Sequence, residues 1–497
     1  MGQLQPQKNV YAVIDLGSNS FHMLIAKSIA GGLQTIGRVK RKVRLAAGLD
    51  ENNVLSTEAM QRGWECLALF AERLQDIPQK NITIVATATL RLATNADVFK
   101  HKAEQILGHK INVISGELEA KTIYKGVAHT SACSGKQLVI DIGGASTEVV
   151  IGQGFDALHY KSLHMGCVTF LERYFKDQKL SNENFAAAIK AASEVVAEIV
   201  DEYQATGWQI ASGASGTVQA IQEIMVAQNQ DELLTLDKLL AIKEQSVQFE
   251  TIADLELPGL SEERRLVFVS GLAILIALFE SLDIRQMGLA RGALREGVLY
   301  SMVPELHNHD IRKRTVDGLM NRYHVDQKQA CRVAQLAEQL AKSVMGQWQS
   351  IDDNAIALLR TVAKLHEIGL LIEYKLYHKH TAYIIENTDM PGFSQSEHKL
   401  ITAVANEHRA DLVKNSFAHL GCHQVLAECL TRVVRIAVIL SMRRQDDVLP
   451  AIDLSVNENT LTLTFDGDWL KYHPLMASEL QLESKLQAKV GWKLIVK

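Results

Sequence analysis

Hydrophobic positions follow two different periods in the first part of this 497-residue chain. Short runs rich in β-branched residues are typical of strands, and they occur at Val10–Asp15, Phe21–Ala26, Ile82–Thr87 and Lys110–Ser115. Apolar residues at every third or fourth position predict helices, at Thr57–Asp76 and Ala96–Leu107. Because strands alternate with helices, we expect an α/β domain over residues 1–124.

A second α/β region is expected at residues 125–305. Its predicted elements are, in order, the strand Leu138–Asp141, the helix Asn182–Ala205, the strand Gln209–Ala211 and the apolar helix Leu266–Leu282. The longest apolar stretch of the chain lies in that last helix and is too short to span a bilayer. We therefore expect a buried core helix and no membrane partner.

The pattern changes after about residue 305. Residues 306–447 show almost only helical spacing with few glycines or prolines, which predicts a helical domain. Residues 448–497 predict a small α/β tail. Its expected elements are the strands Ile452–Val456 and Thr460–Phe465, a helix near Ser478–Lys489 and a final strand.

Both α/β regions begin with the same short motif. A buried strand ends in aspartate, small residues follow, and a second strand begins directly, unlike the strand–loop–helix order of a P-loop. The two copies are Asp15-Leu16-Gly17-Ser18-Asn19-Ser20 and Asp141-Ile142-Gly143-Gly144-Ala145-Ser146. Small residues let backbone N–H groups approach an anion closely. The repeat predicts two related halves that hold a phosphate chain from opposite sides of a cleft.

The carboxylates of this motif indicate a divalent cation. Asp15 and Asp141 would repel a polyphosphate unless a metal ion lay between, and Mg²⁺ binds one or two carboxylates together with phosphate oxygens. Glu148, at the start of the next predicted strand, could reach the same ion. Each aspartate alone could instead be a turn residue that binds its own backbone. The expected donors to phosphate are Ser18, Asn19, Ser20, Gly143, Gly144, Ala145 and Ser146.

A third loop of small residues, Ser212–Thr217, precedes a predicted helix at Val218–Gln228. A helix N-terminus attracts anions through its free N–H groups and its dipole. We expect phosphate contacts from Gly213, Ser215, Gly216 and Thr217. The alternative is that Ser215 or Thr217 only caps the helix.

Several charged positions are candidates for chemistry. Arg91, after the strand Ile82–Thr87, could clamp a phosphate, although a lone arginine on a loop is usually solvated. Glu117 and Glu119 lie where the first half meets the second, and a carboxylate there suits a base that activates water. The residues alone do not choose between them, since either could be a first-turn helix acid. The run Arg38–Arg44 holds five basic residues, as on a solvated strand face or on a surface for a long polyanion.

Composition narrows the class of protein. The formal net charge of −5 argues against a dedicated nucleic-acid binder, whose surface would be basic. Residues 1–8 lack the apolar core of a signal peptide, and the six cysteines show no CxxC spacing. We therefore expect a cytoplasmic protein with reduced thiols.

Together these motifs resemble the exopolyphosphatase/guanosine pentaphosphate phosphohydrolase family, within the actin, sugar kinase and Hsp70-like superfamily of ribonuclease H-like folds. The matching segments are Ile14–His22, Ala86–Asn95, Ile114–Ala120, Ile140–Glu148, Gly213–Thr217 and Gly292–Gly297. The likeness runs through the whole chain, and Lys40–Gly48 and Ser162–Thr169 are closer to the guanosine pentaphosphate branch. It implies duplicated actin-like α/β domains, then a helical HD-like domain and a small α/β tail.

The resemblance also implies roles for single residues. The family's catalytic glutamate precedes the alanine of its Ser-Gly-x-Glu-Glu-Ala motif and corresponds to Glu119, whereas the acid before it is Leu118 in this chain. Arg91 is implied to contact phosphate, and Arg295 and His22 to contact the nucleotide. Mg²⁺ is implied at Asp15, Asp141 and Glu148.

Two parts depart from the family's pattern. Arg291 stands where relatives often have glycine, which changes the backbone there or adds a positive charge near the substrate. The helical region resembles an HD-type phosphohydrolase domain, but its metal motif reads His366-Glu367 with Gln329 at the usual first histidine, and the late aspartate is absent near 435–438. The residues that could restore a site are His378, His380 and His408. We expect a role in packing, dimerisation or a substrate channel instead, since the family implies a homodimer.

The sequence thus predicts an Mg²⁺-dependent hydrolase that converts guanosine pentaphosphate to guanosine tetraphosphate in the stringent response. An exopolyphosphatase acting on inorganic polyphosphate would use the same residues. A regulator that binds these nucleotides without turnover is a third hypothesis, and Glu119, Asp15 and Asp141 count against it. A sugar kinase would share the hairpins, but the likeness of the whole chain to hydrolases disfavours it.

Overall fold

A computed structural model describes residues 9–29, 32–131, 135–303, 310–348 and 351–497. The segment examined for a signal peptide and one of the six cysteines, Cys133, lie outside the described residues. The other five cysteines are free thiols, as expected. The chain forms two compact units, with the second beginning at Asp310, and each is described by itself.

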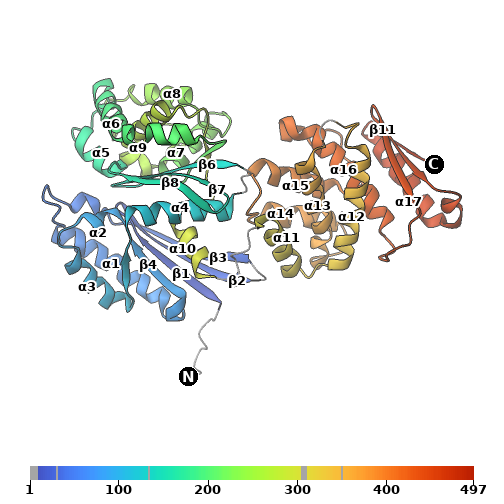
Figure 1. Ribbon diagram of the computed structural model, residues 1–497, viewed down its shortest axis with the longest axis horizontal. Coiled ribbons are helices and arrows are strands. Elements are labelled where there is room, and N and C mark those ends of the chain that lie inside the picture. Colours follow the sequence, from blue (N-terminus) through green and yellow to red (C-terminus); the bar gives the residue numbers. More distant parts are fainter. Residues whose placement is uncertain (1–8, 30–31, 132–134, 304–309, 349–350) are drawn as a thin grey trace. The chain divides into compact units, whose positions relative to one another are not determined.

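The first sheet of the N-terminal unit has the strand order β3-β2-β1-β4-β5. Its strands are β1 (Val10–Leu16), β2 (Ser20–Ile29), β3 (Gly32–Lys42), β4 (Ile82–Ala86) and β5 (Ile111–Val113). β1 pairs antiparallel with β2 and parallel with β4, so the predicted aspartate hairpin lies at the centre of the sheet. Helices α1 (Thr57–Leu74) and α3 (Ala96–Leu107) pack against it (Figure 1).

The second sheet repeats this arrangement with the order β10-β9-β6-β7-β8. Its strands are β6 (Lys136–Ile142), β7 (Thr147–Gln153), β8 (Asp156–Leu163), β9 (Ile210–Gly213) and β10 (Gly288–Leu289). Its helices are α5 (Cys167–Tyr174), α6 (Asn182–Thr206), α7 (Gly216–Ala227), α8 (Leu236–Ser246) and α9 (Glu262–Leu282). β6 and β7 form the second antiparallel hairpin, next to the parallel strand β9. Helix α9 is long and apolar enough to cross a membrane, but 78% of its apolar window is buried inside the unit, as in a core helix.

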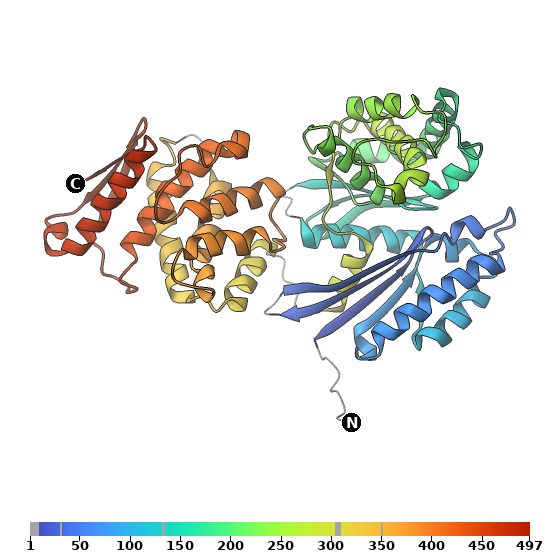
Figure 2. The same cartoon turned by 180° about the vertical axis from the view of Figure 1, so that it is seen from behind.

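Two helices lie between the sheets, α4 (Gly116–Thr130) and α10 (Leu294–Met302) (Figure 2). A shared core joins them to both sheets, including Val13 of β1 and Val150 of β7. Glycine lets the helices touch: a Cβ on Gly126 would lie 2.1 Å from the carbonyl oxygen of Ala293, and one on Gly297 would lie 1.9 Å from that of Thr122. α4 therefore starts at the first sheet and packs across the second, which fixes where its first turn lies.

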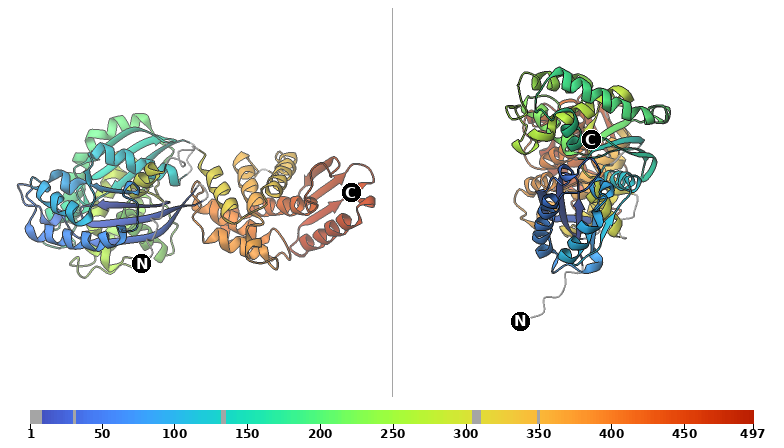
Figure 3. Two further views of the ribbon diagram at one scale, coloured as in Figure 1. Left: turned by 90° about the horizontal axis from the view of Figure 1, so that it is seen from below. Right: turned by 90° about the vertical axis from the view of Figure 1, so that its left-hand side faces the viewer.

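The C-terminal unit is helical and ends in a small sheet. Its helices are α11 (Ile311–Arg322), α12 (Gln327–Val344), α13 (Asp353–Leu365), α14 (Tyr377–Glu386), α15 (Gln395–Glu407) and α16 (Gln424–Leu440). The sheet has the order β11-β12-β13, formed by β11 (Ile452–Asn457), β12 (Thr460–Phe465) and β13 (Lys493–Val496), with α17 (Pro474–Lys489) against it (Figure 3). A bidentate ion pair between the guanidinium of Arg435 on α16 and the carboxylate of Glu483 on α17 fastens the tail to the helices.

Most predicted strands and helices are confirmed within a few residues, and several elements were missed. The segment around Arg91, interpreted as a loop, forms a short helix, α2 (Ala88–Leu92). Strand β8 and the helices α5, α8 and α10 were not among the predicted elements. Helix α9 begins four residues before the predicted start because Glu262–Arg265 form a charged first turn that apolar spacing cannot reveal. Proline at the first position of α17 likewise moves its start to Pro474.

Candidate active site

The turns of the two aspartate hairpins face each other. A Cβ on Gly144 would lie 2.8 Å from the Cβ of Ser18 and 3.3 Å from the backbone nitrogen of Asn19. Only glycine therefore allows the two turns to come so close. The predicted phosphate-binding residues Ser18 and Asn19 of one half are thus brought beside Gly144 of the other.

Backbone hydrogen bonds hold both turns. The carbonyl of Ser18 accepts from the amide of Ala46 at 2.9 Å, and that of Gly144 accepts from the amide of Val168 at 2.8 Å. The amide of Gly143 donates to the carbonyl of Ser146 at 2.8 Å, so this conformation does not offer Gly143 to a phosphate. The amide of Gly143, which was predicted to contact phosphate, is thus used within the turn, and the amides that follow it remain the candidates.

Three carboxylates stand at the ends of the hairpin strands. Asp15 and Asp141 occupy matching positions, and Glu148 on β7 lies across the strand pair from Asp141. One carboxylate oxygen of Glu148 accepts hydrogen bonds from the hydroxyls of Ser146 and Ser162, each at 2.7 Å. The Oδ1 atom of Asp15 is buried and has no hydrogen-bond partner in the described part of the chain.

These acids repel one another in a buried position. Burial raises the pKa of Asp15 to about 6, against the opposing effect of the Arg295 guanidinium. Burial also raises the pKa of Asp141 to about 7, and the charges of Glu148 and Asp15 add to the shift. A bound cation would relieve this repulsion, and the unpartnered oxygen of Asp15 suits a ligand. Among the described residues, no group of three or more His, Cys, Asp or Glu side chains is arranged to hold a metal ion by itself.

Glu119 and Arg91 form an ion pair at the edge of this acidic group. Glu119 is on the first turn of α4, which Ser115 caps by accepting from the amide of Leu118, and only 6% of the residue is exposed. Nη1 of Arg91 lies 3.0 Å from Oε2 of Glu119 and 2.8 Å from the carbonyl oxygen of Ile114. Glu117 is exposed on the same turn. From the sequence alone, Arg91 could have been a solvated arginine on a loop. In the structure it is half-buried and pairs with Glu119, the candidate base.

The charges of the other acids act on Glu119, so it belongs to the same acidic group. Burial raises the pKa of Glu119 well above its usual value, the charges of Glu148 and Asp15 raise it further, and Arg91 opposes the rise. Burial raises the pKa of Glu148 as well, although its two serine partners and Arg91 oppose the rise. The arrangement therefore joins four carboxylates with one arginine, an environment that makes Glu119 a stronger base than a solvated glutamate.

His22 and Arg295 meet beside the acids. Nη1 of Arg295 lies 3.1 Å from Nδ1 of His22. Burial and the charges of Arg295, Lys40 and Arg264 lower the pKa of His22 to about 3, so the ring is neutral near pH 7 and can accept the hydrogen bond. Arg291 is exposed, and Gly292 packs against Thr130 of α4.

The third loop is covered by a residue that the sequence did not single out. A Cβ on Gly216 would lie within 2.1 Å of three guanidinium atoms of Arg264, so this side chain lies directly against the N-terminus of α7. The hydroxyl of Ser215 caps α7, as in the alternative interpretation, and Gly213 and Thr217 pack against Val218 and Gly271 respectively. Arg264 sits in the charged turn before an apolar helix, and nothing in that local pattern marks it as functional.

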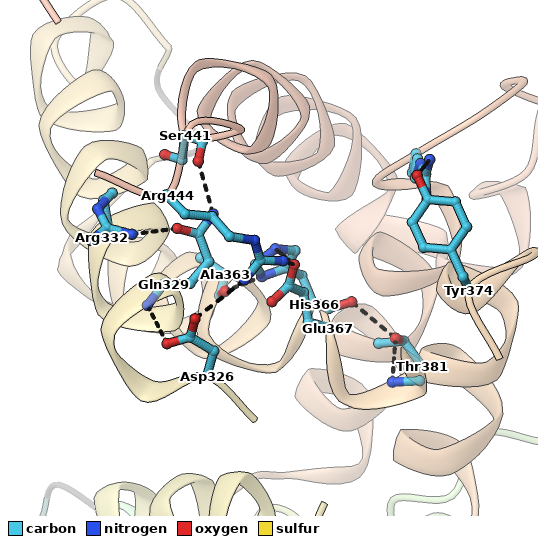
Figure 4. Close-up of polar contacts among 12 residues, drawn as sticks. Asp326, Gln329, Arg332, Ala363, His366, Glu367, Tyr374, Thr381, Ser441 and Arg444 are labelled. Carbon is cyan, nitrogen blue, oxygen red and sulfur yellow. Dashed lines mark hydrogen bonds and ion pairs between the residues drawn. The ribbon is translucent and has the colours of Figure 1, made fainter. Parts of the chain in front are cut away.

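In the C-terminal unit, the residues expected at an altered HD-type motif, Gln329, His366 and Glu367, make polar contacts with other side chains and with backbone carbonyls (Figure 4). The guanidinium of Arg444 pairs with the carboxylates of Glu367 and Asp326. The side-chain amide of Gln329 donates through Nε2 to the carbonyl of Ser441 at 2.9 Å. The cationic guanidinium of Arg444 thus lies against the carboxylate of Glu367.

The histidines of this unit are only partly gathered. His366 and His408 cap the ends of α13 and α15, and each Nδ1 lies 2.6 Å from a carbonyl oxygen of its own helix. The ring of His378 lies 6.2 Å from that of His408 between centroids. Burial lowers the pKa of all three histidines, so they are neutral near pH 7.

Comparison with known proteins finds matches along nearly the whole chain. The model of the Ppx/GppA phosphatase family matches residues 24–306, and that of Ppx/GppA phosphatase, domain III, matches residues 311–484. The guanosine-5′-triphosphate,3′-diphosphate pyrophosphatase of Pseudoalteromonas translucida (strain TAC 125) is 76% identical over 496 residues, covering 100% of both chains. The protein of the same name from Vibrio vulnificus (strain YJ016) is 52% identical over 98% of each chain.

Solved structures show the same fold. An exopolyphosphatase from Cytophaga hutchinsonii ATCC 33406 matches with a TM-score of 0.54 at 23% identity, covering 59% of this chain and 97% of that chain. The Ppx/GppA family member from Aquifex aeolicus matches with a TM-score of 0.51 at 23% identity, covering 60% of this chain and 99% of that chain. The expected duplicated α/β fold is therefore confirmed.

Proposed function

The chain belongs to the Ppx/GppA phosphatase family, and we propose that it removes the terminal 5′ phosphate of guanosine pentaphosphate to give guanosine tetraphosphate and phosphate. The names of its relatives, at up to 76% identity over the whole chain, support the substrate. The observation that carries the reaction is the buried Glu119, held by Arg91 beside the carboxylates of both hairpins.

In this mechanism Glu119 takes a proton from water as the water oxygen bonds to the terminal phosphorus. The bond from that phosphorus to the bridging oxygen breaks, and guanosine tetraphosphate leaves. Arg91 positions the Glu119 carboxylate and offers charge to the transferred group, while the amides after Gly143 hold its oxygens. Asp15, Asp141 and Glu148 would hold Mg²⁺, which supplies positive charge against the developing phosphate charge.

The metal dependence should vary with pH. Asp15 and Asp141 hold protons up to about pH 6 and 7, and a proton must leave before a cation binds. We expect chelation to abolish phosphate release, Mg²⁺ to restore it, and the half-saturating Mg²⁺ concentration to rise about 10- to 20-fold between pH 8 and pH 6. Mg²⁺ titrations of initial rate at the two pH values measure this. Equal half-saturation at both would contradict the assignment of these aspartates as ligands.

Inorganic polyphosphate is the second candidate substrate. Basic residues line the exposed edge strand β3 and continue to Arg44, and a long polyanion could bind there. Comparing kcat/KM for guanosine pentaphosphate, polyphosphate and ATP separates the hypotheses. We expect the highest value for guanosine pentaphosphate, and a large preference for polyphosphate would reverse the ranking. Tight nucleotide binding without phosphate release in Mg²⁺ would instead support a regulator.

We further propose that the enzyme is a cytoplasmic homodimer. The location rests on the scattered cysteines, which show no CxxC spacing. The homodimer rests on the family resemblance, and sedimentation of the purified protein tests it.

A further inference from the structure

Three side chains form one row across the second sheet, close to the turn of its aspartate hairpin. Asp141 of β6 is the direct antiparallel partner of Glu148 on β7, and Glu148 is the direct antiparallel partner of Ser162 on β8. Residues directly opposite one another in neighbouring strands have their side chains on the same face of the sheet. The hydroxyl of Ser162 therefore reaches the acidic group from the strand beyond Glu148.

The first hairpin differs at the matching position. There the direct partner of Asp15 on β2 is His22, seven residues later, just as Glu148 follows Asp141. The ring of His22 lies against the guanidinium of Arg295 instead of accepting from a serine hydroxyl. The two halves thus share the aspartate, but the second half alone places a further carboxylate beside it.

Two serine hydroxyls hold one oxygen of Glu148. Ser146 in the hairpin turn and Ser162 on β8 both donate to Oε1, each at 2.7 Å. Glu148 is only 2% exposed, and no hydrogen bond among the described residues reaches its Oε2. Because two donors on one oxygen limit the rotation of the carboxylate, the direction of the other oxygen is set as well.

Ser162 also lies beside the helix start that leads to the candidate base. A Cβ on Gly116, the first residue of α4, would lie 2.5 Å from the Cβ of Ser162 and 3.5 Å from Nη2 of Arg91. Only glycine lets β8 and α4 approach so closely. Ser162 therefore contacts Glu148 and is a close neighbour of the turn that carries Glu119.

We propose that Ser162 is a positioning residue for the metal centre, because it holds Oε1 of Glu148 and so keeps Oε2 oriented and free for the divalent cation or for a water bound to that cation. Ser162 itself contacts neither the cation nor the phosphate. Hydrogen-bond partners that orient a metal ligand are worth about 10- to 100-fold in metal affinity or activity. The inference rests on the proposed function, with Glu148 as a ligand of Mg²⁺.

The test removes the donor in two ways. Ser162→Ala lacks the hydroxyl, and Ser162→Cys keeps a similar volume with only a weak donor, so either variant can decide if the other does not fold. We expect the half-saturating Mg²⁺ concentration for phosphate release from guanosine pentaphosphate to rise about 10- to 100-fold. At saturating Mg²⁺, kcat and KM should stay within about three-fold of the wild type. An unchanged Mg²⁺ requirement, or a larger loss of kcat that saturating Mg²⁺ does not restore, would overturn the proposal.

Ser246→Ala is the matched control, because it also removes a buried serine hydroxyl from the second half. That hydroxyl donates to the carbonyl of Ile242 in its own helix, at 2.8 Å, and not to a carboxylate. The Mg²⁺ requirement of this variant should match that of the wild type. An equal rise in Ser246→Ala and Ser162→Ala would mean that any lost buried hydroxyl has this effect, and would contradict the assigned role.

Electron paramagnetic resonance with Mn²⁺ alone tests the site without nucleotide or turnover, since carboxylate ligands suit Mn²⁺ as well as Mg²⁺. We expect Ser162→Ala to bind Mn²⁺ at least 10-fold more weakly than the wild type and Ser246→Ala. This result would support the role of Ser162 even if guanosine pentaphosphate is not hydrolysed and the proposed function fails. Equal Mn²⁺ affinity in the three proteins, or no Mn²⁺ binding by the wild type, would overturn the role of Ser162 and leave the substrate to be decided by phosphate release.

Discussion

Glu119→Gln lowers kcat for guanosine pentaphosphate about 10³-fold with little change in KM, if Glu119 is the base. General bases contribute about 10²- to 10⁴-fold, and glutamine keeps the shape of the side chain while losing its ability to take the proton. Arg91 keeps its hydrogen bond to the carbonyl of Ile114 in the variant, so the packing around α4 should persist. Steady-state phosphate release measures the effect, with circular dichroism as the check on folding.

Glu117→Gln separates the two acids that the sequence left open. Glu117 is exposed on the same turn, whereas Glu119 is buried against Arg91. We expect Glu117→Gln to keep kcat within about two-fold of the wild type. Near-normal turnover by a folded Glu119→Gln protein, or a large loss in Glu117→Gln, would remove Glu119 from the proposed role.

The second large effect concerns stability of the C-terminal unit. Arg435 and Glu483 have side chains only 2% and 3% exposed, and two hydrogen bonds of 2.7 Å join them. Arg435 also donates to the carbonyls of Glu407 and Ala410. Glu483→Gln leaves a buried guanidinium without its counter-ion, and removing one partner of such a pair costs about 3–5 kcal/mol.

Hydrogen exchange of the amides in α16 and α17 measures this loss as a lower free energy of opening. Glu479→Gln is the control, since Glu479 lies one turn earlier on α17 and is half-exposed. We expect its exchange to match the wild type. Similar exchange in both variants would mean that the ion pair contributes little to holding the tail.

The sequence predicted the parts of the site that follow from local pattern. Strand, aspartate and small residues recur in order, so the hairpins around Asp15 and Asp141 could be placed from periodicity and turn chemistry alone. The pairing of Arg91 with Glu119 could not, because it joins residues from a short helix and a capped helix start that meet only in the fold. Strand β3 is mostly exposed and edge-placed, so it lacks the apolar alternation that reveals central strands.

Arg264 shows the same limit more sharply. Its local pattern is that of an ordinary charged first turn. Its neighbours in the fold are Gly216, His22 and Lys40, which lie far away in sequence, so the local pattern could not reveal them. In the C-terminal unit, the altered motif at Gln329 and Glu367 was visible in the sequence. The arginine that pairs with Glu367, Arg444, was not, because it follows α16 and reaches back to the residues just after α13.

In the proposed reaction, water attacks the terminal phosphorus of guanosine pentaphosphate. Turnover in water enriched in ¹⁸O, with mass spectrometry of the products, tests this directly. We expect guanosine tetraphosphate without label and inorganic phosphate carrying one ¹⁸O atom from the solvent. Release of pyrophosphate, label in the nucleotide, or binding without any product would contradict it.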